Sequence, residues 1–66
     1  MNDQLPKRRL LDIQETADYL HLKNKQTLYN WIQQRKGPNY LKIGRRLMWE
    51  LSELDRFIDS NRVILN

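Results

Sequence analysis

The chain has 66 residues, no cysteine and a formal net charge of +4. A chain this short can form one domain with one small core, and without cysteine it has neither disulfides nor a cysteine-based zinc site. No apolar run approaches the roughly 20 residues that span a membrane, and no apolar segment of signal-peptide type follows the basic residues near the N-terminus.

The charges are segregated along the chain. Residues 19–49 carry seven basic side chains and no acidic one, whereas all eight carboxylates lie before or after that segment. The basic residues are Lys23, Lys25, Arg35, Lys36, Lys42, Arg45 and Arg46. A continuous basic surface on a small domain is typical of a protein that binds a polyanion, although an ordinary solvated face has the same composition.

The first nine residues are polar and show no periodicity. They predict a flexible basic arm over residues 1–9, followed by a folded domain over residues 10–62. The cluster Lys7-Arg8-Arg9 in this arm either contacts phosphate or remains solvated.

Asp12 and Glu15 have the spacing of a capping box, with Asp in place of Ser or Thr. They predict a helix over residues 13–21. Ile13, Ala17 and Leu20 recur at helical spacing and would form its buried stripe.

Asn24 is a candidate N-cap for a second helix, because its side-chain oxygen can accept a hydrogen bond from an unpaired backbone N–H. This helix is predicted from about residue 25 to residue 34 or 35, and Gly37-Pro38 would terminate it. Its exposed face would carry Gln26, Tyr29, Asn30, Gln33 and Lys36. Two helices joined by a short turn indicate a helix-turn-helix unit.

A β-hairpin is expected next, with strands over residues 40–43 and 47–49 and a turn at Gly44-Arg45-Arg46. Leu41 and Ile43 would point inward. Both arginines would lie at the tip, as in a wing that follows a groove or a DNA backbone.

Ser52-Glu53-Leu54-Asp55 resembles a second capping box and predicts a third helix over residues 53–61. Leu51, Leu54, Phe57 and Ile58 would form its apolar face. Residues 63–66 form a short apolar tail that closes the core, pairs with another subunit or frays.

The predicted fold class is α+β: a small winged helix-turn-helix with a helix-turn-helix unit, a two-stranded β wing and a C-terminal helix. Trp31 and Trp49 could be stacking platforms for single strands, but their apolar faces favour the core. The expected core is Leu11, Ile13, Ala17, Leu20, Leu28, Trp31, Ile32, Leu41, Ile43, Leu54, Phe57 and Ile58.

A family resemblance covers residues 10–60. The chain resembles the excisionase and AlpA-like DNA-binding proteins through six pieces in order: Leu10-Leu11, Glu15-Thr16-Ala17 with Tyr19-Leu20, Thr27-Leu28-Tyr29 with Trp31, Gly37-Pro38, Lys42-Ile43-Gly44-Arg45-Arg46, and Leu54-Asp55-Arg56-Phe57-Ile58. The resemblance implies a MerR-like winged helix-turn-helix, sequence-specific DNA binding, and a phage, prophage or mobile-element setting. Members often have Gly where His21 stands and a basic residue where Asn30 stands.

Candidate DNA-binding residues follow from these elements. Asn30 can pair with adenine in the major groove, and Tyr29 can contact phosphate, sugar or a thymine methyl group. Lys23 and Lys25 flank the start of the second helix, where phosphate binds readily. The full candidate set is Lys23, Asn24, Lys25, Gln26, Thr27, Tyr29, Asn30, Gln33, Lys36, Lys42, Arg45 and Arg46.

No catalytic site, metal site or cofactor is expected. The sequence contains no phosphate-cradling Gly-rich loop, no metal-ligand spacing and no paired nucleophile and base, and His21 is the one histidine. We therefore expect a protein that is not an enzyme.

The predicted function is that of a cytoplasmic, nucleoid-associated protein that binds double-stranded DNA as an excisionase-like recombination directionality factor, a transcriptional regulator, or both. Its expected partners are DNA, further copies of itself on repeated sites, and an integrase or RNA polymerase, with no membrane. One alternative is a DNA-packaging recognition module of the terminase small-subunit type. Another is a protein-interaction adaptor whose basic face binds an acidic protein and whose apolar tail anchors it.

Overall fold

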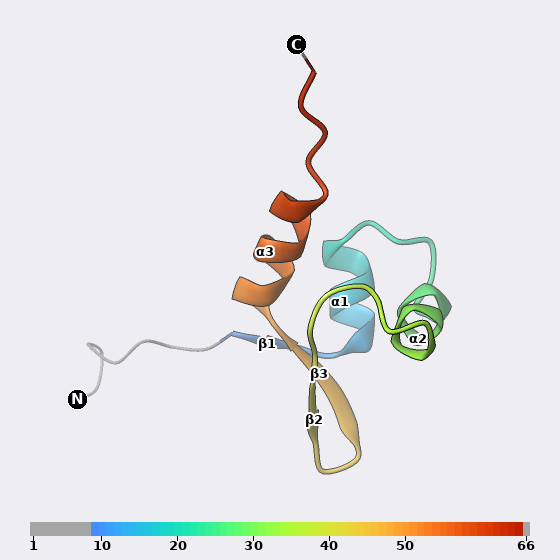
Figure 1. Cartoon of the computed structure of the whole chain (residues 1–66). Coiled ribbons are helices and arrows are strands. Elements are labelled where there is room, and N and C mark those ends of the chain that lie inside the picture. The colour runs from blue at the N-terminus through green and yellow to red at the C-terminus, as the bar shows by residue number, and fades with distance from the viewer. Residues whose placement is uncertain (1–8, 66) are drawn as a thin grey trace, which may run out of the picture.

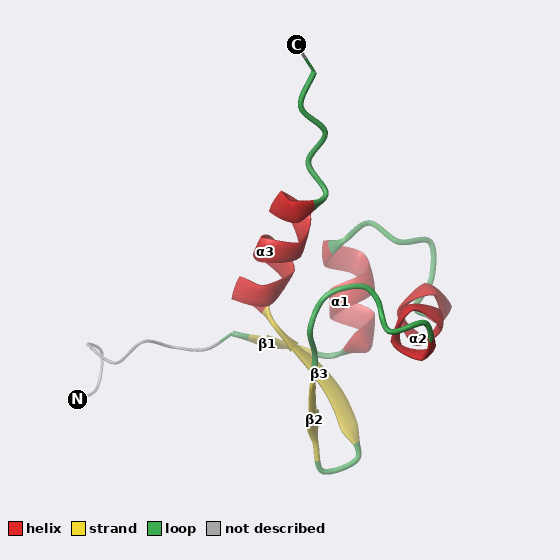
Figure 2. Cartoon of the chain, viewed as in Figure 1, coloured by secondary structure: helices red, strands yellow, loops and turns green. Residues whose placement is uncertain are grey.

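The computed structural model describes residues 9–65. Three helices and three strands follow one another along the chain: β1 (Leu10–Leu11), α1 (Ile13–Tyr19), α2 (Gln26–Gln33), β2 (Leu41–Ile43), β3 (Arg46–Glu50) and α3 (Leu51–Ser60). Figures 1 and 2 show the β2–β3 hairpin, here called the wing, projecting from one end of the domain, while the C-terminal segment leaves from the other. The predicted α+β winged helix-turn-helix is confirmed, with one more strand than expected.

The capping box at the start of α1 is confirmed. Asp12 Oδ1 accepts a hydrogen bond from the Glu15 N–H at 2.8 Å, and Glu15 Oε1 accepts one from the Asp12 N–H at 2.9 Å. Two backbone donors that the helix itself leaves unpaired are thereby satisfied, which explains why α1 begins at Ile13.

Left-handed residues end both helices of the helix-turn-helix unit. His21 has a φ of 60° and Arg35 a φ of 58°. Around His21, its own N–H donates to Asp18 O and the Leu22 N–H donates to Ala17 O, the two bonds of a Schellman motif. The motif at His21 ends α1 at Tyr19, two residues before the predicted end of that helix. The motif at Arg35 has the same two bonds and ends α2.

The strand β1 was not predicted, because two apolar residues are too few to show the alternation of a strand. Leu10 pairs with Glu50 and Leu11 with Trp49, so the antiparallel sheet has the order β1-β3-β2. Of the predicted arm over residues 1–9, only Arg9 lies within the described residues. Its backbone oxygen accepts a hydrogen bond from the Leu51 N–H at 2.9 Å.

The predicted cap at Ser52 is wrong. Strand β3 runs directly into α3, whose N-cap is Glu50 rather than Ser52, and the Glu50 side chain makes no capping hydrogen bond to the described start of the helix. Since the Leu51 N–H already donates to the backbone of Arg9, one donor of the first turn is satisfied by the residue before β1 rather than by a serine.

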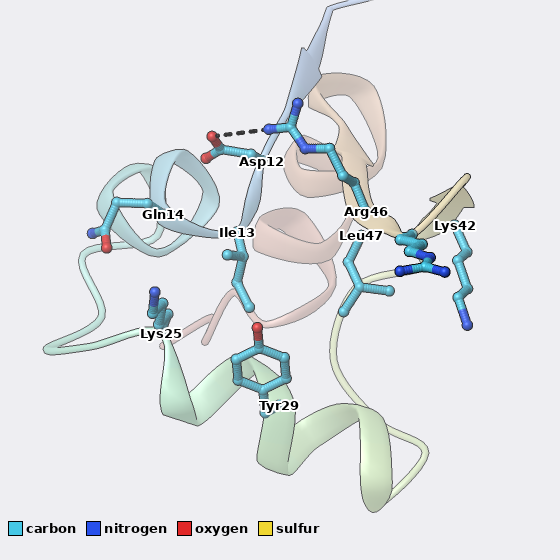
Figure 3. Close-up of a pocket in the computed structure, with 9 residues that line it drawn as sticks. Asp12, Ile13, Gln14, Lys25, Tyr29, Lys42, Arg46 and Leu47 are labelled. Carbon is cyan, nitrogen blue, oxygen red and sulfur yellow. Dashed lines mark ion pairs between the residues drawn. The ribbon is translucent and has the colours of Figure 1, made fainter.

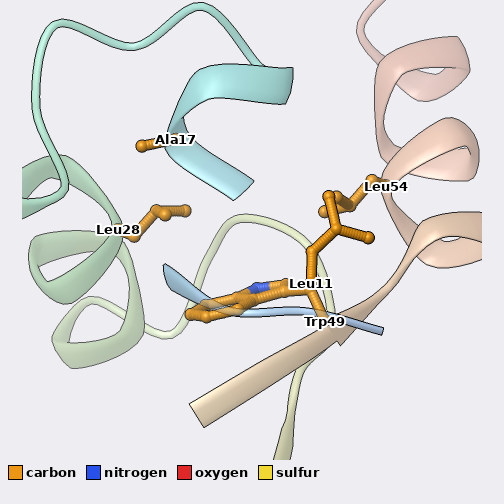
Figure 4. Packing of buried hydrophobic residues seen from close by; sticks show 5 residues of the cluster. All are labelled: Leu11, Ala17, Leu28, Trp49 and Leu54. Atoms are coloured by element: carbon orange, nitrogen blue, oxygen red, sulfur yellow. The ribbon is translucent and has the colours of Figure 1, made fainter. Parts of the chain in front are cut away.

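The core lies between the helices and one face of the sheet. Trp49 is 1% exposed and sits at its centre, which confirms the core role preferred for that residue (Figure 4). Thr16 is also fully buried, and within residues 9–65 neither its hydroxyl nor the Trp49 indole N–H has a hydrogen-bond partner. The buried hydrophobic residues are Leu11, Ala17, Leu28, Trp49 and Leu54.

Two residues of the predicted core are exposed instead. Ile43 is 52% exposed because it pairs with Arg46 in the wing, so both point away from the face that carries Leu47 and Trp49. Ile58 is 42% exposed and lines a shallow hollow at the end of α3 instead of packing into the core.

Side chains of α3 contact both of the other helices. The Tyr19 hydroxyl at the end of α1 donates to Asp55 Oδ1 at 2.5 Å, and this hydrogen bond, with some desolvation and the charge of Asp55, raises the pKa of Tyr19. The Trp31 ring of α2 packs on Phe57 with centroids 5.5 Å apart. The helix-turn-helix unit is therefore attached to α3 by both a polar and an aromatic contact.

Candidate functional site

The start of α2 is set by the loop before it. Asn24 Oδ1 accepts a hydrogen bond from the Gln26 N–H at 2.9 Å, so the predicted interaction of this side chain with the helix start is present. The N-cap position itself falls on Lys25 rather than on Asn24, and α2 begins at Gln26. Lys25 is exposed at a helix start, where unpaired N–H groups favour anions.

A surface hollow of about 540 Å³ opens between the start of α1, the exposed side of α2 and the wing (Figure 3). Four of its lining residues are basic, one is acidic, and the Tyr29 ring rises from α2 with its hydroxyl towards Ile13. This basic hollow is lined by Asp12, Ile13, Gln14, Lys25, Tyr29, Lys42, Arg45, Arg46 and Leu47.

Two elements supply the basic side chains of this hollow. Lys25, the N-cap of α2, and Tyr29 within that helix are four residues apart and so lie on the same side of it. Across from them, Lys42 pairs with Leu47 in the wing, and Arg45 occupies the turn. An anion bound here would contact the helix-turn-helix unit and the wing at once.

The wing turn is a two-residue connection, Gly44-Arg45, between the paired residues Ile43 and Arg46. Gly44 has a φ of 62°, which is the conformation that the first residue of a type II′ hairpin turn requires. Glycine adopts it without strain, and Arg45 is thereby presented at the tip, as predicted.

Arg46 is not at the tip. It is the first residue of β3, and its Nη2 lies 3.6 Å from Asp12 Oδ2. Figure 3 shows this guanidinium directed to Asp12 rather than into the hollow beside Tyr29. The two predicted wing arginines therefore have different surroundings, since Arg46 has a carboxylate partner.

The outer side of α2 carries polar side chains. Gln26 Nε2 donates a hydrogen bond to Asn30 Oδ1 at 3.1 Å, one helical turn along. Gln33 is exposed near the end of the helix, whereas Thr27 is half-buried. Gln26, Asn30 and Gln33 thus form an exposed amide face that borders the basic hollow.

Three other predicted residues lie outside the hollow. Lys23 and Asn24 are exposed in the loop between α1 and α2. Lys36 follows α2, where its N–H donates to Trp31 O, and it lines a second hollow of about 420 Å³ with Arg35 and Tyr40. These residues extend the basic surface along both ends of α2.

Sequence reasoning assigned Asp12 a capping role and missed its contact with Arg46. No local signal could have revealed that contact, because it depends on the pairing of β1 with β3. The same pairing of β1 with β3 brings the start of α1 next to the wing, so the hollow is also lined by Ile13, Gln14 and Leu47.

Within the described residues 9–65, no group of three or more His, Cys, Asp or Glu side chains could hold a metal ion. None of the helices in that part of the chain has the length and apolar composition to cross a membrane.

Comparison with known proteins adds one finding. The profile of a family described as "Helix-turn-helix domain" matches residues 10–62, which include every described helix and strand. The comparisons with curated proteins and with solved structures found no match.

Proposed function

Because the chain belongs to the helix-turn-helix domain family and is a DNA-binding protein of that kind, we propose that α2 enters the major groove and that the wing lies on the adjacent groove or backbone. The observation that carries this proposal is the basic hollow. The hollow is lined by Lys25 at the N-cap of α2 and by Lys42 and Arg45 of the wing, so a phosphate backbone can contact both elements together.

The amide face of α2 is the proposed reading surface. Gln26, Asn30 and Gln33 can donate and accept hydrogen bonds at base edges, and a good bidentate pair between Asn and adenine discriminates by about 1–3 kcal/mol. The bond from Gln26 to Asn30 holds the Asn30 side chain on this face before DNA binds. Tyr29, 41% exposed beside the hollow, is placed for a phosphate or sugar contact.

The proposed role is that of a phage or mobile-element regulator, acting as an excisionase-like directionality factor, a transcriptional regulator, or both. The six-part resemblance to excisionase and AlpA-like proteins supports it. One domain of this size reads only a few base pairs, so useful specificity requires neighbouring copies on repeated sites, or an integrase or RNA polymerase beside it.

The first experiment is a mobility-shift titration on DNA fragments from around the protein's own gene, at two salt concentrations and with unrelated competitor DNA. A discrete complex that survives competitor supports sequence-specific binding, and a ladder of complexes supports cooperative binding. Absence of a complex at low salt contradicts the proposal.

The contribution of the wing is tested by Arg45→Ala. Loss of one phosphate contact should flatten the log–log dependence of affinity on salt by about one unit. Arg56→Ala is the matched control, because it removes the same charge from α3, away from the hollow. Equal effects of the two substitutions would remove the wing from the mechanism.

The reading role of Asn30 has a separate test. Asn30→Ala should lower the affinity for a specific site more than the affinity for unrelated DNA, because it removes a base contact and no charge. Equal losses on both kinds of DNA would show that Asn30 does not read sequence.

A protein partner is the second candidate, and one observation favours it. Val63, Ile64 and Leu65 are 77–87% exposed and follow α3 as an extended segment (Figure 1). Such a segment suits an anchor on another protein. A pull-down that nuclease treatment does not reduce would support this adaptor role.

A further inference from the structure

The two carboxylate oxygens of Asp12 have different partners. Oδ1 accepts the capping hydrogen bond from Glu15 N–H at 2.8 Å, and Oδ2 lies 3.6 Å from Arg46 Nη2 (Figure 3). Capping needs only the first oxygen, and asparagine caps helices as well as aspartate does. The cap therefore does not require the negative charge of Asp12. That charge also attracts the Arg46 guanidinium.

Asp12 is also the one acidic side chain among the described residues that line the basic hollow. A phosphate that binds Arg46 competes with Asp12 for the charge of this guanidinium. The pair is well exposed, with 68% of the Arg46 side chain and 36% of the Asp12 side chain accessible, so it is weak enough to exchange.

We propose that Asp12 restrains sequence-independent DNA binding by holding Arg46 away from phosphate. This inference rests on the proposed function, in which the hollow contacts the DNA backbone. Lys25, Lys42 and Arg45 have no ion pair to a carboxylate among the described residues, and they supply the electrostatic attraction. Arg46 contributes less binding free energy than its charge suggests. The net gain is the difference between the interaction of Arg46 with phosphate and its interaction with Asp12.

The restraint has a physical purpose. Contacts to phosphate are independent of sequence, and a genome offers an excess of about a million or more competing sites. A carboxylate that weakens the contacts to the DNA phosphates lowers the affinity for all sequences alike. Base contacts made by α2 then supply a larger share of the binding free energy.

The test uses Asp12→Asn in the full chain, titrated with an unrelated duplex at several salt concentrations. The substitution keeps the capping oxygen and releases Arg46. Affinity should rise about two- to fivefold at low salt, on the scale of one exposed ion pair, and the salt dependence should steepen by about one unit. Asp12→Ser, which also retains a capping oxygen, gives a second variant, and circular dichroism verifies the fold of each.

Asp59→Asn is the matched control. It removes the same charge from an ion pair of 2.7 Å with Arg62 at the end of α3, away from the hollow. If Asp12→Asn and Asp59→Asn raise affinity equally, net charge explains the gain and the inference is wrong.

Adding Arg46→Ala to Asp12→Asn separates the route of the effect. The gain should disappear, because it depends on the released guanidinium. A gain that persists without Arg46 would mean that Asp12 acts by repelling phosphate directly, which overturns the inference. Failure of the unchanged chain to bind any duplex is a different result, since it refutes the proposed function itself.

Discussion

Replacing His21 with glycine is expected to stabilise the fold by about 0.5–1 kcal/mol. His21 has a φ of 60°, and the left-handed conformation costs an L-residue roughly 1–2 kcal/mol. Glycine avoids that cost but loses about 0.5–1 kcal/mol more backbone entropy on folding. The His21 side chain is exposed and makes no described hydrogen bond or ion pair, so little else is lost.

Thermal unfolding followed by circular dichroism provides the measurement. For a domain of this size the expected gain raises the Tm by about 2–8 °C. Two controls isolate the backbone term. His21→Ala removes the imidazole but keeps the left-handed requirement, and should give no gain. Gln34→Gly adds flexibility where φ is −87° and should destabilise. Equal Tm values for the Gly and Ala variants at position 21 would refute the reasoning.

Three further outcomes are expected. Gly37→Ala should destabilise by about 2–3 kcal/mol in denaturant unfolding, because φ is 90° and the new Cβ would lie 2.8 Å from Trp31 Cε3; an unchanged midpoint would contradict this. Thr16→Val should stabilise by roughly 1 kcal/mol, because a methyl group replaces a buried hydroxyl that has no hydrogen-bond partner among the described residues; a loss in the same assay would indicate that the hydroxyl makes a hydrogen bond. The raised pKa of Tyr19 means that the folded state favours the protonated phenol. Its contribution to stability is therefore present below about pH 10 and is lost as pH rises through the folded-state pKa. Asp55→Ala, which removes the accepting oxygen, should lower the pKa of Tyr19 in an absorbance titration of the phenolate, and an unshifted titration would rule out their hydrogen bond as its cause.

The sequence predicts well the interactions between residues that are close along the chain. The capping box of Asp12 and Glu15 spans three residues, and the turn at Gly44 needs only its own backbone freedom, so both could be identified from spacing alone. The helix-turn-helix unit and the basic surface around it follow from the same kind of short-range pattern.

Long-range pairing accounts for the errors. The short strand β1 has too few residues to show an alternating pattern, so nothing indicated that Leu11 would pair with Trp49. That pairing decides which face of β3 is buried and places Asp12 beside Arg46. Ile43 was assigned to the core because alternation identifies two faces of a strand without saying which one the helices cover.

The absence of a loop between β3 and α3 has a consequence for assembly on DNA. Since Glu50 ends the strand and Leu51 begins the helix, the direction of α3 is tied to that of the wing. A protein docked on α3 would therefore project from the double helix at a set angle around its axis. Two such proteins on neighbouring sites would face the same side when the sites are separated by whole turns of about 10.5 base pairs. Inserting about five base pairs would turn them to opposite sides, so cooperation through α3 should alternate with spacer length.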